Sequence, residues 1–571
     1  MVLSTTVIRK LAALYPYDVS GSDALAESLS FLDSPHDEKT VVRASYGAGI
    51  IGSLIPIPLF LTSAPISFVL FFVLVAPTAA VYAVRSVPQL QAAFRRTEAL
   101  GETPNLIGRA VLRMQVQPAL ESAVRFAAKT GSGPLPASLD SHIDRSMGTA
   151  NTGLLSFAEE WAEWFPALRR SSHLLATAQD APEGERARTL DRALSAVLNG
   201  TRNQMAEFTA AIRAPTTGLF AFGIMIPLAL IALVPAVPMV GFSVNIWLVV
   251  LLYNIVLPAC LIAASLWLLV RRPVAFPPPN VSHDHPDVPD RLWRRGLWGV
   301  FAGGCGYAVT ATVGPAHLAS VIGLGLGLGA GLLAIFRPIL EVRNYVRDVE
   351  AHLTDALYIV GRQVAEGESV ESAIELTAKR VPAETGAIFE HAAGVQRRLH
   401  VGVDAAFLGE YGALRAVPSS RVRGTAALLA IAADEGKPAG RAIVSMADHL
   451  EELDDVEAKT KRSLEQVTGT LDNTAAYFGP LVAGATVAMA AMMSDEELVG
   501  AADVDAAAFP AESLAIVVGI YLVTLCFILI PLSIALRYGL DRALVGYHVG
   551  RALVSSMVLY GVSVAIIEMV L

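Results

Sequence analysis

The sequence predicts an all-α, polytopic membrane protein with about nine spans and two cytoplasmic helical-bundle domains arranged as a tandem duplication. Of its 571 residues, 54% are hydrophobic and the mean hydropathy is +0.52, which exceeds what an ordinary soluble domain contains. The apolar residues form long continuous runs, which favours helices over barrel strands in lipid. None of the 43 Lys and Arg residues falls inside these runs, so the cations mark the cytoplasmic side.

Each apolar run is long enough for one or two membrane-spanning helices, because about 20 helical residues cross the ~30 Å hydrocarbon core. The first run divides into Ala44–Leu61 and Ala64–Val84, and the third divides into Leu297–Val313 and His317–Phe336. The Lys and Arg distribution predicts a multi-pass membrane protein with a cytoplasmic N-terminus and an external C-terminus. The predicted hairpins are residues 44–84, 216–270, 297–336 and 473–536, followed by a last span over 552–571.

The segments between these hairpins are polar, and all but one of them carry Lys or Arg. The exception is the acidic stretch 495–512, which contains neither residue and is therefore expected to be an external loop. The other segments are expected to be cytoplasmic. They are an N-terminal segment (1–43), a first helical domain (85–215), a Pro-rich linker (271–296), a second helical domain (337–472) and a turn (537–551).

The two large polar regions share a local sequence pattern, which indicates parallel repeats. Leu120-Glu121-Ser122-Ala123 in the first region and Val370-Glu371-Ser372-Ala373 in the second lie 250 residues apart. In the second region the apolar spacing predicts a helix from Leu357 to Ala365. Gly367 is a suitable residue to end this helix, and Ser369 is a suitable cap for the next one. Both domains are therefore expected to be small antiparallel helical bundles.

These patterns of helix, turn and span resemble the type II secretion system F-domain family, which comprises the membrane platform proteins of type IV pili, type II secretion systems and archaella. The resemblance is carried by NLIGRAVLRMQVQPALESA (Asn105–Ala123) and DALYIVGRQVAEGESVESAIELTAKR (Asp355–Arg380). The charged helix Ser445–Val467, which runs into FGPLVAGATVAMA (Phe478–Ala490), is most similar to archaeal members. In the first domain, Gln117-Pro118 stands where a Gly-containing turn is common in the family.

The resemblance implies a function without enzymatic activity. Residues 85–215 and 337–472 would be F domains that bind a cytoplasmic hexameric ATPase of the secretion type. The spans would pass the movement of this ATPase to type IV pilin-like subunits, and a homodimer is also implied. Whether the filament is an adhesive pilus, an archaellum or a secretion pseudopilus stays open.

Motifs for other chemistry fail on their spacing. Gly436-Lys437 is followed by Pro438 rather than by Ser or Thr, so the phosphate-loop pattern is not met. All three cysteines lie in apolar runs, which excludes a thiolate metal site in the soluble parts. Ser282–His285 belongs to the Pro-rich linker and has no further ligand cluster. The net charge of −9 argues against a nucleic-acid partner, and we expect no enzyme activity, cofactor or metal.

Arginines gather near the helix–turn–helix openings of both polar regions. One interpretation is a solvated helix surface that is attracted to anionic membrane lipid. The other interpretation is an electrostatic docking surface for the ATPase, and the sequence does not separate the two. The candidate docking residues are Arg109, Arg113, Arg125, Arg362, Arg397, Arg398, Arg421 and Arg423.

A glycine-rich stretch in the third hairpin predicts close helix packing. Gly323, Gly327 and Gly331 share one face of the predicted span, where small residues let two helix backbones approach each other. This candidate helix-packing face is compatible with homodimerisation. A dinucleotide-binding loop is rejected for the same glycines, because no strand precedes them.

The alternative function is a helical-repeat membrane transporter. Its support is a set of prolines that could break spans around a substrate path: Pro227, Pro258, Pro480 and Pro531. A transporter also needs polar groups at mid-membrane. The predicted spans carry few of these beyond Ser, Thr, Tyr and Asn254, and for this reason the platform function is preferred.

Overall fold

The computed structural model describes residues 5–61, 65–131, 133–147, 152–237, 245–274, 281, 285–289, 291–314, 316–435, 439–493 and 511–570. Within these ranges every regular element is a helix, which confirms the all-α prediction. Three expectations concern residues outside the described ranges. They are the Gly436–Pro438 motif, Ser282–Asp284 of the linker, and nearly all of the external loop 495–512.

The first half of the chain connects its apolar part to a bundle through two long helices. α4 (Ile66–Gly101) has 36 residues and carries the chain into the first bundle. α10 (Glu183–Phe220) has 38 residues and carries it back. Both exceed the ~20 residues that a bilayer needs, so each belongs to the apolar part and to the bundle alike. The helices before α4 are α1 (Thr5–Ala13), α2 (Asp23–Phe31), α3 (Glu38–Gly52) and the 3-10 helix η1 (Ile57–Leu61).

The first bundle opens with a turn that needs no glycine. Gln117 adopts an extended conformation (φ −133°, ψ 111°), which is the conformation that a following proline favours. The bundle helices are α5 (Thr103–Val116), α6 (Leu120–Thr130), α7 (Pro134–Ser146), α8 (Gly153–Trp161) and α9 (Pro166–Asp180). After α10 come η2 (Ala221–Met225), α11 (Ile226–Leu233), η3 (Val234–Ala236), α12 (Ile246–Leu251), η5 (Leu252–Val256) and α13 (Leu257–Val270).

The second half has the same order of long and short helices. α15 (Ala319–Ala351) and α21 (Ala439–Asn473) connect its apolar part to the second bundle. Gly367 is left-handed (φ +107°), and the Ser369 hydroxyl accepts a hydrogen bond from the Ser372 amide at 3.2 Å. The predicted stop and cap are therefore confirmed. The bundle helices are α16 (Leu353–Glu366), α17 (Val370–Arg380), α18 (Ala383–Leu399), α19 (Val403–Leu408) and α20 (Ser420–Glu435). The others are α14 (Leu292–Val313), η6 (Ala316–Leu318), η7 (Thr474–Phe478), α22 (Gly479–Met493), α24 (Ala511–Tyr538) and α25 (Arg542–Val570).

Three successive helices end at equivalent positions in the two halves, at the same offset of 250 residues that separates the shared sequence motif. The entry helices α4 and α15 also contain prolines at equivalent positions, Pro88 and Pro338. The two halves therefore follow one helix plan. The equivalent ends are Gly101 and Ala351, Val116 and Glu366, and Thr130 and Arg380.

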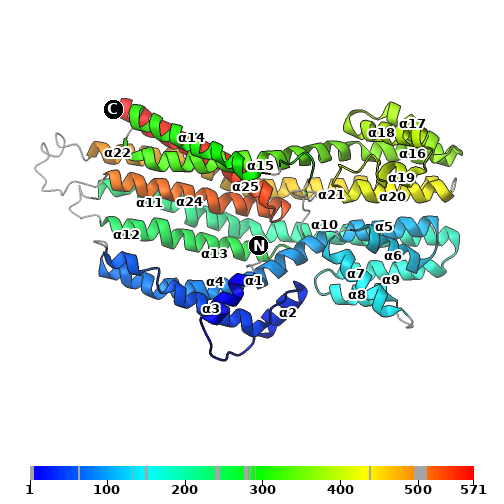
Figure 1. Cartoon of the computed structure of the whole chain (residues 1–571), viewed down its shortest axis with the longest axis horizontal. Helices are drawn as coiled ribbons and strands as arrows, with labels where there is room; N and C mark the ends of the chain where they lie inside the picture. The colour runs from blue at the N-terminus through cyan, green and yellow to red at the C-terminus, as the bar shows by residue number, and fades with distance from the viewer. Residues whose placement is uncertain are drawn as a thin grey trace, which may run out of the picture.

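Both bundles lie at the same end of the elongated molecule, and the C-terminus is marked at the opposite end (Figure 1). The bundles contact each other through α5 and α21. The helix α1 lies midway along the long axis, between the apolar helices and the bundles (Figure 1). The two polar domains therefore share one side of the apolar part, as the charge distribution predicts.

Among the described residues, seven helices are long and apolar enough to cross a membrane. This supports a membrane-embedded protein but does not match all nine predicted spans. The segment 44–61 is not one helix but is divided between α3, which ends at Gly52, and the separate η1. Pro56 and Pro58 prevent a continuous helix, because they cannot donate helix hydrogen bonds. α14 is helical over 22 residues. It is not one of the seven, because its five glycines contribute no apolar side chain. The seven helices are Ile66–Val116, Gly184–Ala236, Ile246–Val270, Ala316–Glu366, Ala439–Met492, Ala511–Tyr538 and Arg542–Ile567.

Candidate coupling site

The eight candidate docking arginines divide into a surface group and a buried group. Arg113 is half-buried and five others are exposed. Two of the exposed side chains face carboxylates of their own bundle, Arg362 at 3.1 Å from Glu366 and Arg397 at 3.8 Å from Glu375. Exposed ion pairs contribute little to stability, so these two arginines can exchange their carboxylate partners for those of another protein. Docking stays a prediction for all six arginines. The exposed five are Arg125, Arg362, Arg397, Arg398 and Arg423.

Arg109 does not belong to that surface. Its exposed fraction is 6%, and it lies in the seam between the two bundles. A Cβ atom at Gly424 of α20 would be 3.5 Å from its Cδ, and one at Gly131 would be 2.8 Å from its Nη2. In the same seam, Gly108 leaves the space that His449 of α21 fills. Arg109 is therefore covered rather than exposed, and docking through it stays a prediction. The apolar spacing of α5 gives no sign that a second bundle covers this face.

Arg421 is also largely covered and forms two ion pairs within its own bundle, and docking through it stays a prediction. Its Nη1 lies 2.7 Å from Asp454 Oδ1 and its Nη2 lies 2.9 Å from Glu457 Oε1. Burial lowers the pKa of the Arg421 guanidinium, but Glu457 and Asp454 outweigh burial and raise the pKa above its usual value. A positive charge that two carboxylates of its own bundle neutralise offers little attraction to a partner.

The predicted glycine face is found in close helix packing, but its partner is in the same chain. A Cβ atom at Gly323 or Gly327 would lie 3.0 Å from the carbonyl oxygens of Gly303 and Gly299 in α14. A Cβ atom at Gly331 would lie 3.6 Å from the Cα of Gly299. α14 of the same chain therefore covers this face, and homodimerisation stays a prediction.

The opposite face of α15 uses the alternate glycines against α25. A Cβ atom at Gly329 would lie 2.9 Å from the carbonyl oxygen of Gly550, and one at Gly550 would lie 2.8 Å from the carbonyl oxygen of Gly329. A Cβ at Gly325 would lie 2.5 Å from Met557 Cγ. α15 is therefore held between α14 and α25, and small residues set its distance from both neighbours. The sequence analysis missed this second face.

A bidentate ion pair joins α15 to the turn between α24 and α25. Arg343 Nη1 and Nη2 each lie 2.6 Å from an oxygen of Asp541, and the side chains are 6% and 20% exposed. The same carboxylate accepts a hydrogen bond from the Leu544 amide at 2.8 Å and thereby caps α25. Two parallel hydrogen bonds between planar groups fix orientation as well as distance, so this pair holds the turn firmly to α15.

A second ion pair joins α24 to α21. Its arginine, Arg537, lies about one helical turn before Asp541 in the chain. The Arg537 guanidinium contacts the Asp472 carboxylate and donates at 2.8 Å to the hydroxyls of Thr468 and Ser533. Asp472 and Thr468 belong to α21, the helix that carries the chain out of the second bundle. Both long helices of the second bundle are thus connected to the bundle-side end of α24.

Arg272 connects the first half of the chain to the same place. It follows α13, is 4% exposed, and donates hydrogen bonds to the carbonyl oxygens of Ala535 and Arg537 at the end of α24. Thr97 of α4 in turn lies 3.3 Å from the Arg272 carbonyl oxygen. A cation at a helix C-terminus is favourable. We call Arg272, Arg343, Asp472, Arg537 and Asp541 the coupling hub.

In the sequence, Arg271, Arg272 and Arg537 serve only as markers of topology, and no site is predicted from them. A signal was present, because Asp472 and Arg537 are single charges directly beside apolar segments, and such charges are functional candidates. What the sequence lacked was the pairing, since the members of the hub come from distant segments.

The first bundle is attached differently, through the N-terminal strap, which is α2. The Arg96 guanidinium of α4 lies between two aromatic rings, 5.2 Å from the Phe31 ring and 3.9 Å from the Trp164 ring. Phe31 also packs against Trp161 at 6.0 Å between ring centroids, and Arg96 lies 3.5 Å from Glu27. The strap therefore joins α4 to the α8–α9 corner of the first bundle by cation–π and aromatic contacts.

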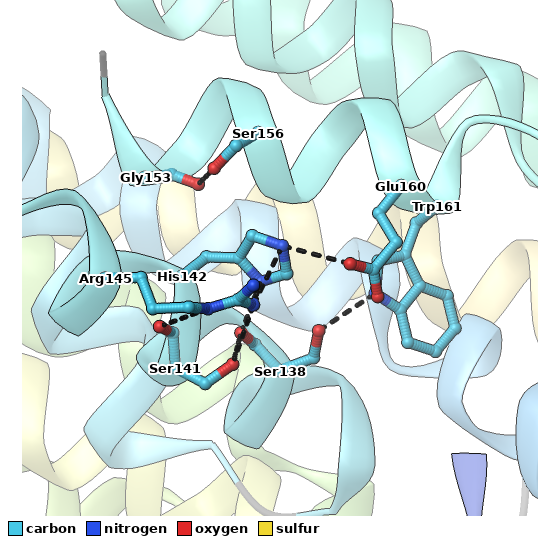
Figure 2. Close-up of polar contacts among 8 residues, drawn as sticks. All are labelled: Ser138, Ser141, His142, Arg145, Gly153, Ser156, Glu160 and Trp161. Carbon is cyan, nitrogen blue, oxygen red and sulfur yellow. Dashed lines mark hydrogen bonds and ion pairs between the residues drawn. The ribbon is translucent and has the colours of Figure 1, made fainter. Parts of the chain in front are cut away.

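A polar cluster in the first bundle has the residue types of a hydrolase site but not its geometry. Figure 2 shows the His142 ring pointing toward Glu160, with its Nε2 3.1 Å from the carboxylate and its Nδ1 2.8 Å from the Ser138 carbonyl oxygen. Both ring nitrogens are thus occupied. The Ser141 hydroxyl donates to the Ser138 carbonyl at 2.7 Å, and the Ser138 hydroxyl accepts from Trp161 at 3.1 Å. The cluster joins α7 to α8 and contains no nucleophile–base pair.

Within the described residues, no group of three or more His, Cys, Asp or Glu side chains is arranged to hold a metal ion. No protein-family model, curated protein or solved structure matches this chain. The candidate site is therefore the coupling hub together with the exposed arginines of the bundles.

Proposed function

We propose that this chain is a non-enzymatic integral membrane platform of a type IV pilus-like filament or secretion machine. In this proposal the two bundles are F domains that bind a cytoplasmic hexameric ATPase, and the apolar helices pass its movement to pilin-like subunits entering the filament. The protein is a multi-pass component of the plasma membrane with both bundles inside the cell. The common helix plan of the halves is attributed to a tandem duplication.

The observation that carries this proposal is the continuity of the four long helices. α4, α10, α15 and α21 each have between 33 and 38 residues and run from a bundle into the apolar part. Such a helix extends over about 50 Å, which is longer than the hydrocarbon core. A continuous helix carries a displacement applied at the bundle, whereas a loop would absorb it. The fold thus suits mechanical coupling between a cytoplasmic partner and the membrane.

The coupling hub adds a second argument for the same function. α15 meets the α24–α25 turn through Arg343, and α21 meets α24 through Arg537. α4 reaches α24 less directly, through the hydrogen bond of Thr97 to the Arg272 carbonyl oxygen and that of Arg272 to Ala535. Side chains that are buried and paired resist independent movement of these helices. A force on either bundle would therefore reach the same pair of apolar helices, which is what an assembly platform requires.

The proposal is tested by the partners and the phenotype of the full chain in its own host. A tagged chain, purified from membranes in mild detergent, should recover a secretion-type hexameric ATPase and pilin-like subunits. Deletion of the gene should remove a surface filament or a secretion activity, and the wild-type gene should restore it. Filaments and secretion at the normal level in the deletion strain would contradict the proposal.

The purified chain itself separates the platform from its alternative. A platform should neither bind nor hydrolyse ATP, because the phosphate-loop pattern is not met. Reconstituted in liposomes, it should also accumulate no solute. Solute uptake that depends on the chain would favour the helical-repeat transporter instead. ATP binding that survives removal of contaminating ATPase would contradict a purely mechanical role.

A further inference from the structure

We infer that α1 and the tyrosines that follow it form a membrane-surface anchor that binds the anionic headgroups of phospholipids. This inference does not rest on the proposed function, because it concerns only the N-terminal segment and the bilayer beside it. Its support comes from the two faces of α1, from the helix on which α1 lies, and from the charges that it presents.

The first argument is that α1 is amphipathic and leaves part of its apolar surface uncovered. Ile8 is 6% exposed and packs inward, whereas Val7 is 42% exposed and Leu14, directly after the helix, is 48% exposed. Arg9 and Lys10 are also exposed. A short helix with apolar and basic residues on its free surface is typical of segments that lie in the headgroup region of a membrane.

The second argument is the position of α1 on α3. The two helices approach so closely that a Cβ atom at Gly47 would overlap the carbonyl oxygen of Leu11. One turn further along α3, Ile50 and Ile51 are each 45% exposed, as expected for side chains that face lipid. α1 is therefore held beside the point at which the surface of α3 changes from polar to apolar, which is the level of the membrane–water boundary.

Three tyrosines mark the same level. Tyr15 lies 5.3 Å from Tyr17 and 4.9 Å from Tyr46 of α3 between ring centroids, and Tyr17 is 68% exposed. Tyrosine is enriched at the membrane interface because its ring is apolar and its hydroxyl prefers water. This cluster lies at the end of α1 and extends the surface that would contact headgroups.

The charges of the segment specify the kind of lipid. Asp18 lies 3.3 Å from Arg43, and this pair is largely neutralised. No ion pair of Arg9 or Lys10 occurs among the described residues, so both cations are available to an external anion. Two such cations on an apolar element favour anionic phospholipid over neutral phospholipid. An anchored α1 would also fix the strap that follows it and thereby give the first bundle a second attachment to the bilayer.

The test compares the full-length protein in nanodiscs of phosphatidylcholine alone and in nanodiscs that also contain phosphatidylglycerol. Amide hydrogen exchange of α1 should be about tenfold slower in the anionic lipid, because each cation near the surface contributes to binding. The difference should disappear in Arg9→Gln/Lys10→Gln and at high salt. These exposed substitutions should leave the fold unchanged.

The matched control is Arg397→Gln/Arg398→Gln, an exposed pair of cations in the second bundle. It removes the same charge from the chain, and it should keep the full lipid effect on α1. The inference is overturned if wild-type α1 exchanges equally fast in both lipids, or if the lipid effect persists unchanged in Arg9→Gln/Lys10→Gln. Loss of the effect in the control would also overturn it, because net charge rather than α1 would then attract the lipid.

Discussion

The two halves of the chain share a helix plan but hold their bundles to the apolar part in different ways. In the second half, buried ion pairs join α15 and α21 to the end of α24, through Arg343–Asp541 and Arg537–Asp472. In the first half, the strap joins α4 to the bundle through the contact of Arg96 with Phe31 and Trp164. One attachment depends on desolvated charge, and the other on aromatic surfaces that are partly open to water.

This difference teaches that equivalent helices need not carry equal mechanical roles. A bidentate buried pair is directional and cannot slide, so the second bundle should move with α24 and α25 as one unit. Cation–π and aromatic contacts allow more variation in geometry, so the first bundle should be able to shift on α4.

The largest effect is expected from breaking the hub. Arg343→Ala leaves the Asp541 carboxylate mostly buried without its bidentate partner and should lower the free energy of unfolding by about 3 kcal/mol. Thermal unfolding of the purified protein in detergent measures this loss. The matched control is Arg337→Ala on the same helix, which removes an exposed pair with Glu341 and should cost no more than about 0.5 kcal/mol. Equal losses in the two variants would contradict a special role of the hub.

The same ion pair should also produce a dependence of stability on pH. Burial raises the pKa of Asp541, but hydrogen bonds from Arg343 and from the Leu544 amide outweigh it, so the net pKa lies below the usual 3.8. Stability from this carboxylate is therefore fully present above pH 3.8 and is lost as the pH falls through the folded-state pKa. Melting temperatures measured at descending pH should fall more steeply for wild type than for Asp541→Asn. Parallel curves would show that Asp541 is not paired as described.

A smaller effect is expected from the strap. Arg96→Ala removes the cation from between Phe31 and Trp164 and should lower the free energy of unfolding by about 1 kcal/mol. Limited proteolysis should then cut α2 more rapidly than in wild type, because the strap loses its contact with α4. The control Arg95→Ala changes the exposed neighbouring arginine and should leave both readouts unchanged. If Arg96→Ala costs as much as Arg343→Ala, the proposed contrast between the halves is wrong.

The smallest effect on stability is expected at the bundle surfaces. Arg397→Glu/Arg398→Glu in the second bundle and Arg169→Glu/Arg170→Glu in the first should each change stability by less than about 0.5 kcal/mol. If the second bundle drives the apolar helices directly, only the first-named variant should abolish filament assembly while its membrane level stays normal. Its association with the ATPase should weaken most at low salt, where long-range attraction is strongest. Wild-type filament density in that variant would place docking elsewhere.

Much of the local structure could be predicted because its causes lie within a few residues of one another. The continuous apolar runs and the absence of Lys and Arg from them predict long membrane helices. Gly367 and Ser369 ended one helix and capped the next as expected. The prediction failed at 44–61, where Pro56 and Pro58 outweighed hydrophobicity, and this cause was visible in the sequence.

The helical class, the polar and apolar parts, and the common helix plan of the two halves follow from composition and short-range spacing, so they can be predicted from the sequence. Which side chains meet depends on the tertiary structure. The tertiary structure covers Arg109 with the second bundle, and it places α14 of the same chain on the glycine face. It paired Arg343 with Asp541 across 198 positions. Such pairings depend on how long helices cross in space, and no local pattern carries that information.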